Sequence, residues 1–178
     1  MEEDMRQSRR RENQNRDDLA GEYRWGDIGQ LLLACLFAAV WIVDTFVLGY
    51  TSFLNEIVPV AVRLPLAAVF FILSAYLSFR GLGIVFGEVR ETPGVIRTGV
   101  FGLVRHPIYL GEILLYLGFL SLNISLAAVV IWLLAIGFLH YLSRYEERLL
   151  IDRFGDEYRR YILEVPMWIP GTKRKQCL

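Results

Sequence analysis

Four long apolar segments dominate this sequence and restrict the folds that it can adopt. Residues 28–49, 57–79 and 124–143 each supply about the 20 apolar positions that an α-helix needs to cross a hydrocarbon core about 30 Å thick. Residues 107–122 form a shorter fourth segment, which a brief turn at 121–123 joins to the last one. We therefore expect an all-α integral membrane protein with about four transmembrane helices, of which the last two form an antiparallel hairpin.

The basic residues are segregated and predict how the helices are oriented. Six Lys and Arg side chains precede residue 28, four lie within 80–105, and eight lie from residue 144 onward. The loops 50–56 and 121–123 contain none. Because short loops rich in Lys and Arg stay on the cytoplasmic side, we expect both termini to be cytoplasmic.

Composition argues against several other kinds of protein. Residues 1–18 have no apolar core, so we expect a solvated polar tail and not a cleavable secretion signal. The two cysteines, Cys35 and Cys177, form neither a disulfide framework nor a metal-binding spacing. We expect membrane lipids as partners, and neither a nucleic acid nor a metal ion.

Two charged residues fall inside the first two apolar segments. Asp44 and Arg63 are equally distant in sequence from the middle of the connecting turn, so an antiparallel pair of helices would bring them to a similar depth. Ionised side chains within a membrane helix are costly and usually pair with one another. We therefore predict a structural ion pair between them.

A basic stretch begins the third apolar segment. Pro107 suits the first position of a helix, which places His106 at or next to the cap. Arg105 and His106 would then lie beside free backbone N–H groups, a favourable place for a carboxylate or phosphate. Tyr109 and Glu112 follow on the first turns, where Glu112 either extends to the interface or faces a polar cavity. The alternative interpretation is a simple topology anchor.

An acidic pair lies where the fourth segment continues past the membrane. Residues 144–171 carry apolar side chains at helical spacing and contain Glu146 and Glu147, so we expect a cytoplasmic helical extension. An interfacial amphipathic helix is the alternative. In a hairpin, this pair would emerge about one helix spacing, roughly 8–10 Å, from Arg105 and His106. A ligand with both a carboxylate and positive charges would fit between the two groups.

These two stretches resemble a known family. TGVFGLVRHPIYLG and EERLLIDRFGDEYRRYILEVPMWIP are similar to the isoprenylcysteine carboxyl methyltransferase family and its relatives, the phospholipid N-methyltransferases. The shared pattern is Arg-His-Pro-x-Tyr-x-Gly and, one hairpin later, Glu-Glu, Phe-Gly-x-x-Tyr-x-x-Tyr and Val-Pro. The resemblance implies an integral membrane enzyme that uses S-adenosyl-L-methionine without a Rossmann domain. The sequence agrees, since it has no Gly-x-Gly-x-x-Gly motif after a strand.

The apolar segments and the resemblance, which covers about residues 94–171, together divide the chain, and the resemblance assigns its site. A polar cytoplasmic tail (1–27) precedes a transmembrane hairpin and loop (28–93), a cofactor-binding core (94–171) and a basic tail (172–178). The cofactor-binding residues implied are Arg105, His106, Tyr109, Leu110, Gly111, Glu146, Glu147 and Tyr161. The catalytic residues implied are Arg105, Glu147 and Tyr158, at the cytoplasmic face.

The acceptor is predicted only by class. The resemblance implies methyl transfer to a lipidic acceptor that enters from the bilayer, with the carboxylate of a prenylcysteine or a similar isoprenoid acid as the first candidate. Three alternatives stay open. They are a phospholipid amine N-methyltransferase, an NADPH-dependent membrane reductase of the sterol type, and a non-enzymatic membrane subunit. Sterol-type reductases usually carry Asn where this chain has Ile108.

Overall fold

The computed structural model describes residues 26–87 and 94–170, and every regular element in that part of the chain is helical. The predicted all-α fold is therefore confirmed. Most of the predicted polar tail and all of the basic tail lie outside the described residues. The elements, in order, are α2 (Gly26–Val43), the π-helical turn η2 (Asp44–Leu48), α3 (Leu54–Ile57), α4 (Val60–Gly87), the 3-10 turn η3 (Gly99–Gly102), α5 (Pro107–Leu122), α6 (Leu126–Phe154) and α7 (Asp156–Glu164).

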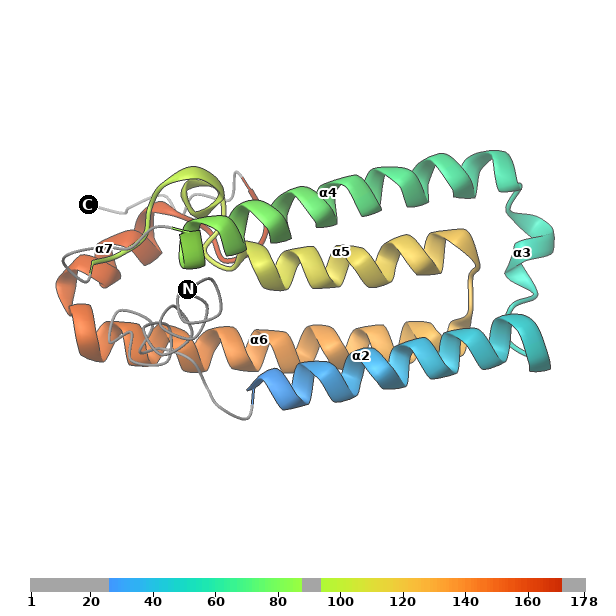
Figure 1. Ribbon diagram of the computed structural model, residues 1–178. Coiled ribbons are helices and arrows are strands. Elements are labelled where there is room, and N and C mark those ends of the chain that lie inside the picture. The colour runs from blue at the N-terminus through green and yellow to red at the C-terminus, as the bar shows by residue number, and fades with distance from the viewer. Residues whose placement is uncertain (1–25, 88–93, 171–178) are drawn as a thin grey trace, which may run out of the picture.

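The four long helices lie side by side and alternate in direction (Figure 1). α3 marks one end of the bundle, and α7 follows the end of α6 at the other, the end at which α5 begins. We call these the α3 end and the α7 end. Three helical stretches have the length and apolar character of membrane spans: Gly26–Leu48, Val60–Phe86 and Leu126–Phe154. The shorter apolar helix Pro107–Leu122 completes the expected set of about four.

The helix boundaries differ from the apolar segments at two places. Pro59 interrupts the second segment, because the residue before a proline disfavours helical geometry and Val58 is extended, with φ −94° and ψ 113°. The fourth helix, in contrast, continues without a break to Phe154. At 1.5 Å per residue it is about 43 Å long, which exceeds a hydrocarbon core of about 30 Å. Glu146 and Glu147 lie about 30 Å from the start of this helix, at the edge of such a core, and the turns after them extend beyond it.

α4 and α5 approach each other closely through small residues. The Oγ of Ser74 on α4 donates a hydrogen bond to the carbonyl oxygen of Gly111 at 2.7 Å. A Cβ atom on Gly111 would lie 2.3 Å from the Oγ of Ser78. Two turns further along α5, a Cβ atom on Gly118 would lie 2.6 Å from the ring of Phe71. Small residues and interhelical hydrogen bonds of this kind are typical of helix contacts in membranes.

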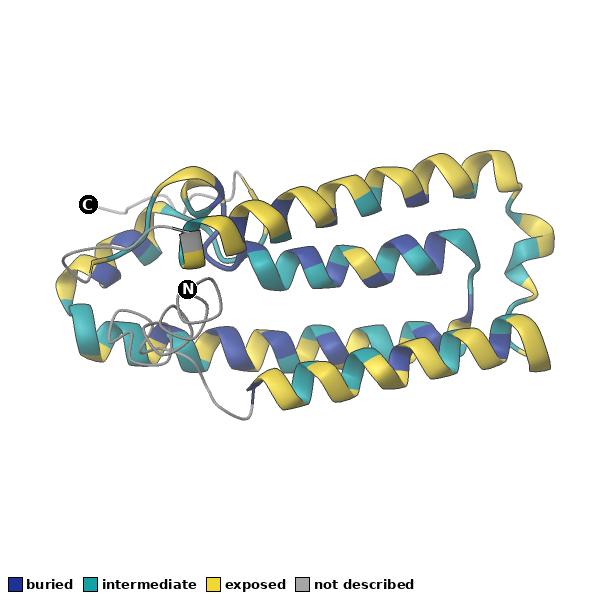
Figure 2. Ribbon diagram, in the orientation of Figure 1, coloured by how far each residue is buried: buried dark blue, intermediate teal, exposed yellow. Residues whose placement is uncertain are grey.

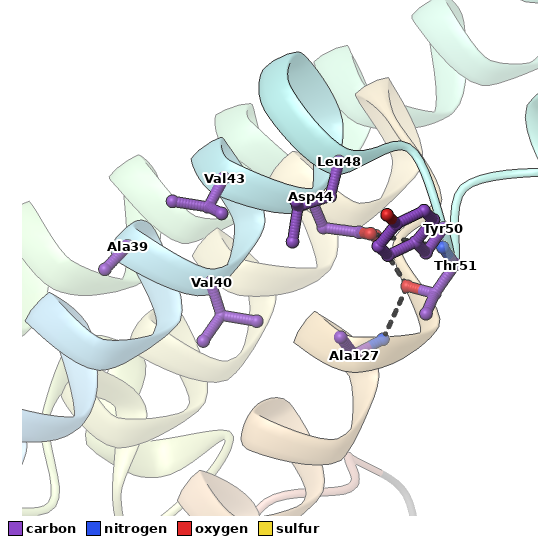
Figure 3. Close-up of a pocket in the computed structure, with 8 residues that line it drawn as sticks. All are labelled: Ala39, Val40, Val43, Asp44, Leu48, Tyr50, Thr51 and Ala127. Atoms are coloured by element: carbon purple, nitrogen blue, oxygen red, sulfur yellow. Dashed lines mark hydrogen bonds between the residues drawn. The ribbon is translucent and has the colours of Figure 1, made fainter.

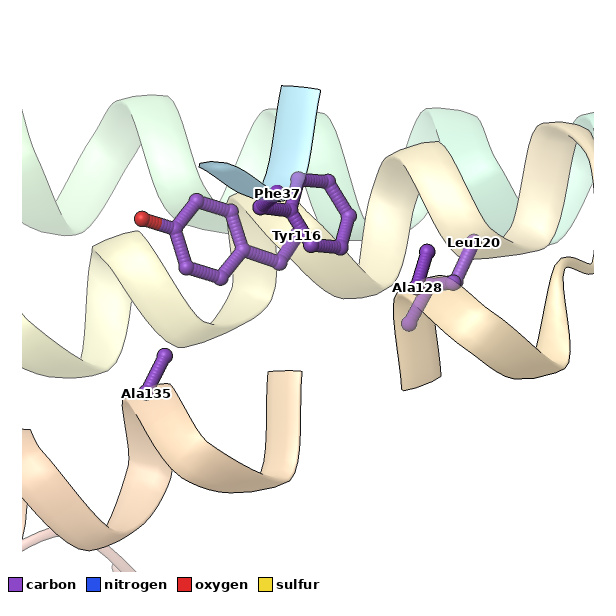
Figure 4. Close-up of a cluster of buried hydrophobic side chains, with 5 residues drawn as sticks. All are labelled: Phe37, Tyr116, Leu120, Ala128 and Ala135. Atoms are coloured by element: carbon purple, nitrogen blue, oxygen red, sulfur yellow. The ribbon is translucent and has the colours of Figure 1, made fainter. Parts of the chain in front are cut away.

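A buried cluster joins α2, α5 and α6. The rings of Phe37 and Tyr116 stack with their centroids 4.4 Å apart, and small side chains of α6 lie beside them (Figure 4). The outer faces of α2 and α4 are mostly exposed (Figure 2). These faces carry Leu31, Leu32, Ile72 and Phe79. Exposed apolar surface on this scale is suited to contact with lipid.

The α3 end contains the two charged residues of the first two spans. Asp44 accepts hydrogen bonds from the backbone N–H and the Oγ1 of Thr51 at 3.1 and 2.5 Å. That hydroxyl also accepts a hydrogen bond from the N–H of Ala127, which links the end of α2 to the start of α6 (Figure 3). A hollow of about 370 Å³ lies beside this network and is lined mainly by apolar side chains.

The predicted ion pair between Asp44 and Arg63 is wrong. Arg63 donates instead to the carbonyl oxygens of Val58 and Leu122 and to the side chain of Asn55. No ion pair joins Asp44 to Arg63, both of which belong to the described part of the chain. The loops between the spans supply each charge with its own hydrogen-bond partners, so neither needs the other.

Candidate active site

The α7 end is organised around the start of α5. Pro107 is the first residue of the helix, and His106 is its N-cap, with φ −122° and ψ 67°. The N–H groups of Arg105 and His106 donate to the carbonyl oxygens of Pro166 and Met167 at 3.0 and 3.3 Å. The C-terminal segment that contains these carbonyls therefore covers the loop before α5. The backbone N–H groups of Arg105 and His106 themselves are therefore used within the protein.

Arg105 forms a buried ion pair with Glu147 of α6. Its Nε and Nη2 atoms both lie 2.7 Å from Oε1 of Glu147, and the two side chains are 7% and 4% exposed. Its third nitrogen, Nη1, donates to the carbonyl oxygens of Ile162 and Val165. All three nitrogens of the guanidinium thus have partners within the protein. The side chain ties the start of α5 to α6, α7 and the C-terminal segment.

His106 lies between the two glutamates. Its Nε2 atom is 3.4 Å from Oε1 of Glu147, and its Nδ1 atom is 3.5 Å from Oε2 of Glu146. Burial opposes a charge on the imidazole, but hydrogen bonds to Glu146 and Glu147 outweigh this effect and raise the pKa of His106 above its usual value. The imidazole therefore favours its protonated form. The ring of Tyr109 stacks on it at 5.6 Å, almost parallel.

The two adjacent glutamates have different environments. Glu147 is 4% exposed and is paired with Arg105. The side chain of Glu146 is 18% exposed, lies near His106, and accepts a hydrogen bond from the hydroxyl of Tyr109. Glu146 is thus the more accessible carboxylate of the pair. We call Arg105, His106, Tyr109, Glu146 and Glu147 the polar cluster.

α7 closes one side of the polar cluster. Gly155 has φ +55°, a conformation that favours glycine, and it allows the chain to turn from α6 into α7. Tyr161 of α7 donates a hydrogen bond to the carbonyl oxygen of Phe101 at 2.7 Å. Tyr158 is buried beside it, and burial together with the nearby charge of Glu147 raises the pKa of the Tyr158 hydroxyl. Tyr161 thus ties α7 to η3, the turn before α5, and the ring of Tyr158 packs against the ring of Tyr161.

The structure brings most of the predicted site residues together, but not all of them. The polar cluster, Tyr158 and Tyr161 gather at the α7 end. Gly111 instead faces α4, where Ser74 and Ser78 contact it. Leu110 donates its backbone N–H to the carbonyl oxygen of His106, as an ordinary helical residue does. The geometry thus gives Gly111 a packing role, and cofactor contacts for Leu110 and Gly111 stay a prediction.

Glu112 lies one turn deeper in the bundle than Tyr109. Its Oε1 accepts a hydrogen bond from the hydroxyl of Tyr116 at 2.6 Å, and that hydroxyl points towards the N-terminal end of α5 (Figure 4). The carboxylate is therefore held inside the bundle and not at the interface. Of the two possibilities left open by the sequence, the structure favours the interior one.

Sequence reasoning missed three residues at this end. Arg97, counted only as a topology signal, forms an ion pair with Glu164 at 3.0 Å and lies over the ring of Tyr161. Ser143 Oγ and Trp168 Nε1 are buried, and neither has a hydrogen-bond partner among residues 26–87 and 94–170. The position of Ser143, four residues before Glu147, could have placed it on the same face of the helix. No sequence signal separates Arg97 from other loop arginines.

Comparison with known proteins shows the family. The model of the phospholipid methyltransferase family matches residues 57–157, which is more than half of the chain, so this chain belongs to that family. This confirms the resemblance found in the sequence.

A curated relative adds a second comparison. Methanethiol S-methyltransferase 1 of Bradyrhizobium diazoefficiens is 40% identical over 86 residues. The aligned region is 46% of this chain, and the chain spans only 28% of the length of that relative. No solved structure matches the chain significantly.

Proposed function

We propose that this protein is an integral membrane methyltransferase that uses S-adenosyl-L-methionine and carries its active site in the polar cluster. The main support is that Arg105 and His106, from the start of α5, lie within 3.5 Å of Glu146 and Glu147, from the end of α6. The site therefore contains buried groups of both charges, which suit a small ligand that also carries both charges. The chain belongs to a methyltransferase family, and the proposed methyl donor is such a ligand.

The residues present fit such a methyl donor. Glu146, the more accessible glutamate, suits its ammonium group. His106, whose two ring nitrogens face Glu146 and Glu147, holds these carboxylates in place. Ser143 and Trp168 provide buried polar atoms that lack partners within the described residues, and a bound ligand would satisfy them. Arg105 and Glu147 act as positioning residues in this assignment, because their contacts are with each other and with backbone carbonyls.

Methyl transfer requires the protein mainly to align the methyl donor with the acceptor. When bound, S-adenosyl-L-methionine supplies a methyl group on a positively charged sulfur. The protein holds the acceptor in line with that methyl group and excludes water, which are sources of rate enhancement in their own right. Tyr109, stacked on His106 and hydrogen-bonded to Glu146, is placed to orient the reacting groups.

The acceptor class has three candidates. The sequence resemblance suggests a prenylcysteine carboxylate, and the family description suggests a phospholipid amine. The name of the curated relative suggests a thiol. A carboxylate would need a cation, yet the guanidinium of Arg105 is already paired with Glu147. The structure therefore gives the carboxylate acceptor less support than the sequence did.

Binding and transfer experiments test this function. Purified protein in lipid nanodiscs is titrated with S-adenosylhomocysteine and, separately, with NADPH. It is then incubated with methyl-labelled S-adenosyl-L-methionine and a prenylcysteine analogue, phosphatidylethanolamine or an alkyl thiol. We expect binding of S-adenosylhomocysteine and labelling of one acceptor. Binding of NADPH alone would support a reductase and overturn the proposal, and binding of neither would favour a non-enzymatic subunit.

A further inference from the structure

Glu112 is the only carboxylate on α5, and the proposed recognition of the methyl donor does not use it. It is partly buried in a helix that is otherwise apolar, apart from hydroxyl groups. Ionisable side chains at such positions are costly and usually serve a function. Its hydrogen bond with Tyr116 satisfies only one carboxylate oxygen.

Glu112 is next to the polar cluster but on its membrane side. Tyr109, Glu112 and Tyr116 follow one another at spacings of three and four residues, so they lie on one face of α5. Tyr109 donates to Glu146 at the α7 end, whereas Tyr116 stacks on Phe37 in the core of the bundle. Glu112 thus lies between the proposed donor site and the apolar interior.

The two carboxylate oxygens of Glu112 differ in their hydrogen bonding. Tyr116 donates to Oε1, and no donor from residues 26–87 or 94–170 is placed on Oε2. Tyr109, one turn before Glu112 on α5, donates its hydroxyl to Glu146, so a second carboxylate lies at this end of the helix. This part of the bundle therefore disfavours an anionic acceptor and can receive a proton.

We propose, on the basis of the proposed function, that Glu112 accepts the proton of an apolar thiol that is the methyl acceptor. A neutral thiol behaves as a small apolar group and can enter this region from the bilayer. An ammonium group would lose its hydration there at considerable cost. A thiol is a good nucleophile only as the thiolate, so it needs the base that Glu112 provides.

The transfer step balances with these groups. The carboxylate of Glu112 takes the S–H proton, and the sulfur lone pair of the acceptor forms a bond to the methyl carbon. The bond between that carbon and the donor sulfur breaks, and its electron pair stays on the donor sulfur, which becomes neutral. The products are a methyl thioether, S-adenosylhomocysteine and a proton on Glu112, which is then released to solvent.

The test compares thiols of different acidity in wild-type protein and in Glu112→Gln. With an alkyl thiol, which is protonated at neutral pH, we expect the variant to lose about 100-fold or more in turnover. With an aromatic thiol, which is largely ionised already, we expect a loss of less than about tenfold. Glu112→Asp, which keeps a carboxylate, should recover part of the activity. Glu56→Gln makes the same chemical change at an exposed residue of the α3 end and should match the wild type.

A binding measurement supplies a readout that does not depend on turnover. In nanodiscs with S-adenosylhomocysteine, the wild type should bind an alkyl thiol several-fold more tightly than Glu112→Gln does. The methyl thioether, which has no S–H group, should bind both proteins equally. Equal affinity of both proteins for the thiol would contradict the assigned contact.

Failure of this inference is distinguishable from failure of the proposed function. A wild-type protein that neither binds S-adenosylhomocysteine nor transfers a methyl group overturns both. An active protein that methylates only a carboxylate or an amine overturns the thiol assignment alone. If the Glu112→Gln variant kept full activity, or lost the same factor in turnover with every thiol, the proton-accepting role of Glu112 would be wrong.

Discussion

Arg105 and Glu147 join α5 and α6 through a buried ion pair in which both Nε and Nη2 contact the same carboxylate oxygen at 2.7 Å. The pair lies 42 residues apart in sequence and shields its charges almost completely from solvent. Removing one partner of such a pair leaves the other charge buried without compensation, which typically costs about 3–5 kcal/mol.

Glu147→Gln should therefore destabilise the fold. We expect a loss of about 3–5 kcal/mol, seen as a large fall in the melting temperature of the protein in detergent. Glu157→Gln, at an exposed position of α7, is the matched control and should change the melting temperature little. If Glu147→Gln melted like the wild type, the ion pair would not hold α5 and α6 together.

Glu146→Gln should affect ligand binding more than stability. Glu146 is partly accessible and has no arginine partner among the ion pairs of the described residues. Losing a hydrogen bond to a charged group costs about 1.5–3 kcal/mol, so the affinity for S-adenosylhomocysteine should fall by roughly 10- to 100-fold. Calorimetry in nanodiscs measures this change. Unaltered affinity together with a large fall in melting temperature would reverse the roles assigned to the two glutamates.

His106 should make stability depend on pH. Its pKa in the folded protein is raised above the value of about 6.5 that it has when unfolded. The charge of His106 therefore contributes fully to the free energy of unfolding below about pH 6.5. This contribution is lost as the pH rises through the higher pKa of His106 in the folded protein. Between pH 6 and pH 9, the melting temperature of the wild type should fall relative to that of His106→Gln. Parallel curves for the two proteins would show that His106 does not titrate in this range.

The sequence predicted the helices and the meeting of the two motifs for clear physical reasons. Apolar length defines the membrane spans, and Pro107 together with the short turn before α6 brings Arg105 to Glu147. The sequence did not predict the hydrogen-bond or ion-pair partners of the charged side chains. Arg105 pairs with Glu147 and with backbone carbonyls, and Arg63 pairs with backbone carbonyls and the side chain of Asn55 instead of Asp44. Backbone carbonyls leave no signal in the sequence, so these partners could not be predicted from it.

The packing of Gly111 was not predicted from the sequence either. Its motif suggested a cofactor contact, whereas its surroundings in the structure indicate close contact with α4. In Gly111→Ala, the new Cβ would lie 2.3 Å from the Oγ of Ser78 and 3.2 Å from the carbonyl oxygen of Ser74. Overpacking of this kind typically costs about 1–3 kcal/mol, so the melting temperature should fall. Ser78→Ala removes the nearest atom, so the double variant should recover part of the loss. If Gly111→Ala weakened S-adenosylhomocysteine binding without changing the melting temperature, Gly111 would belong to the ligand site and not to the contact between α4 and α5.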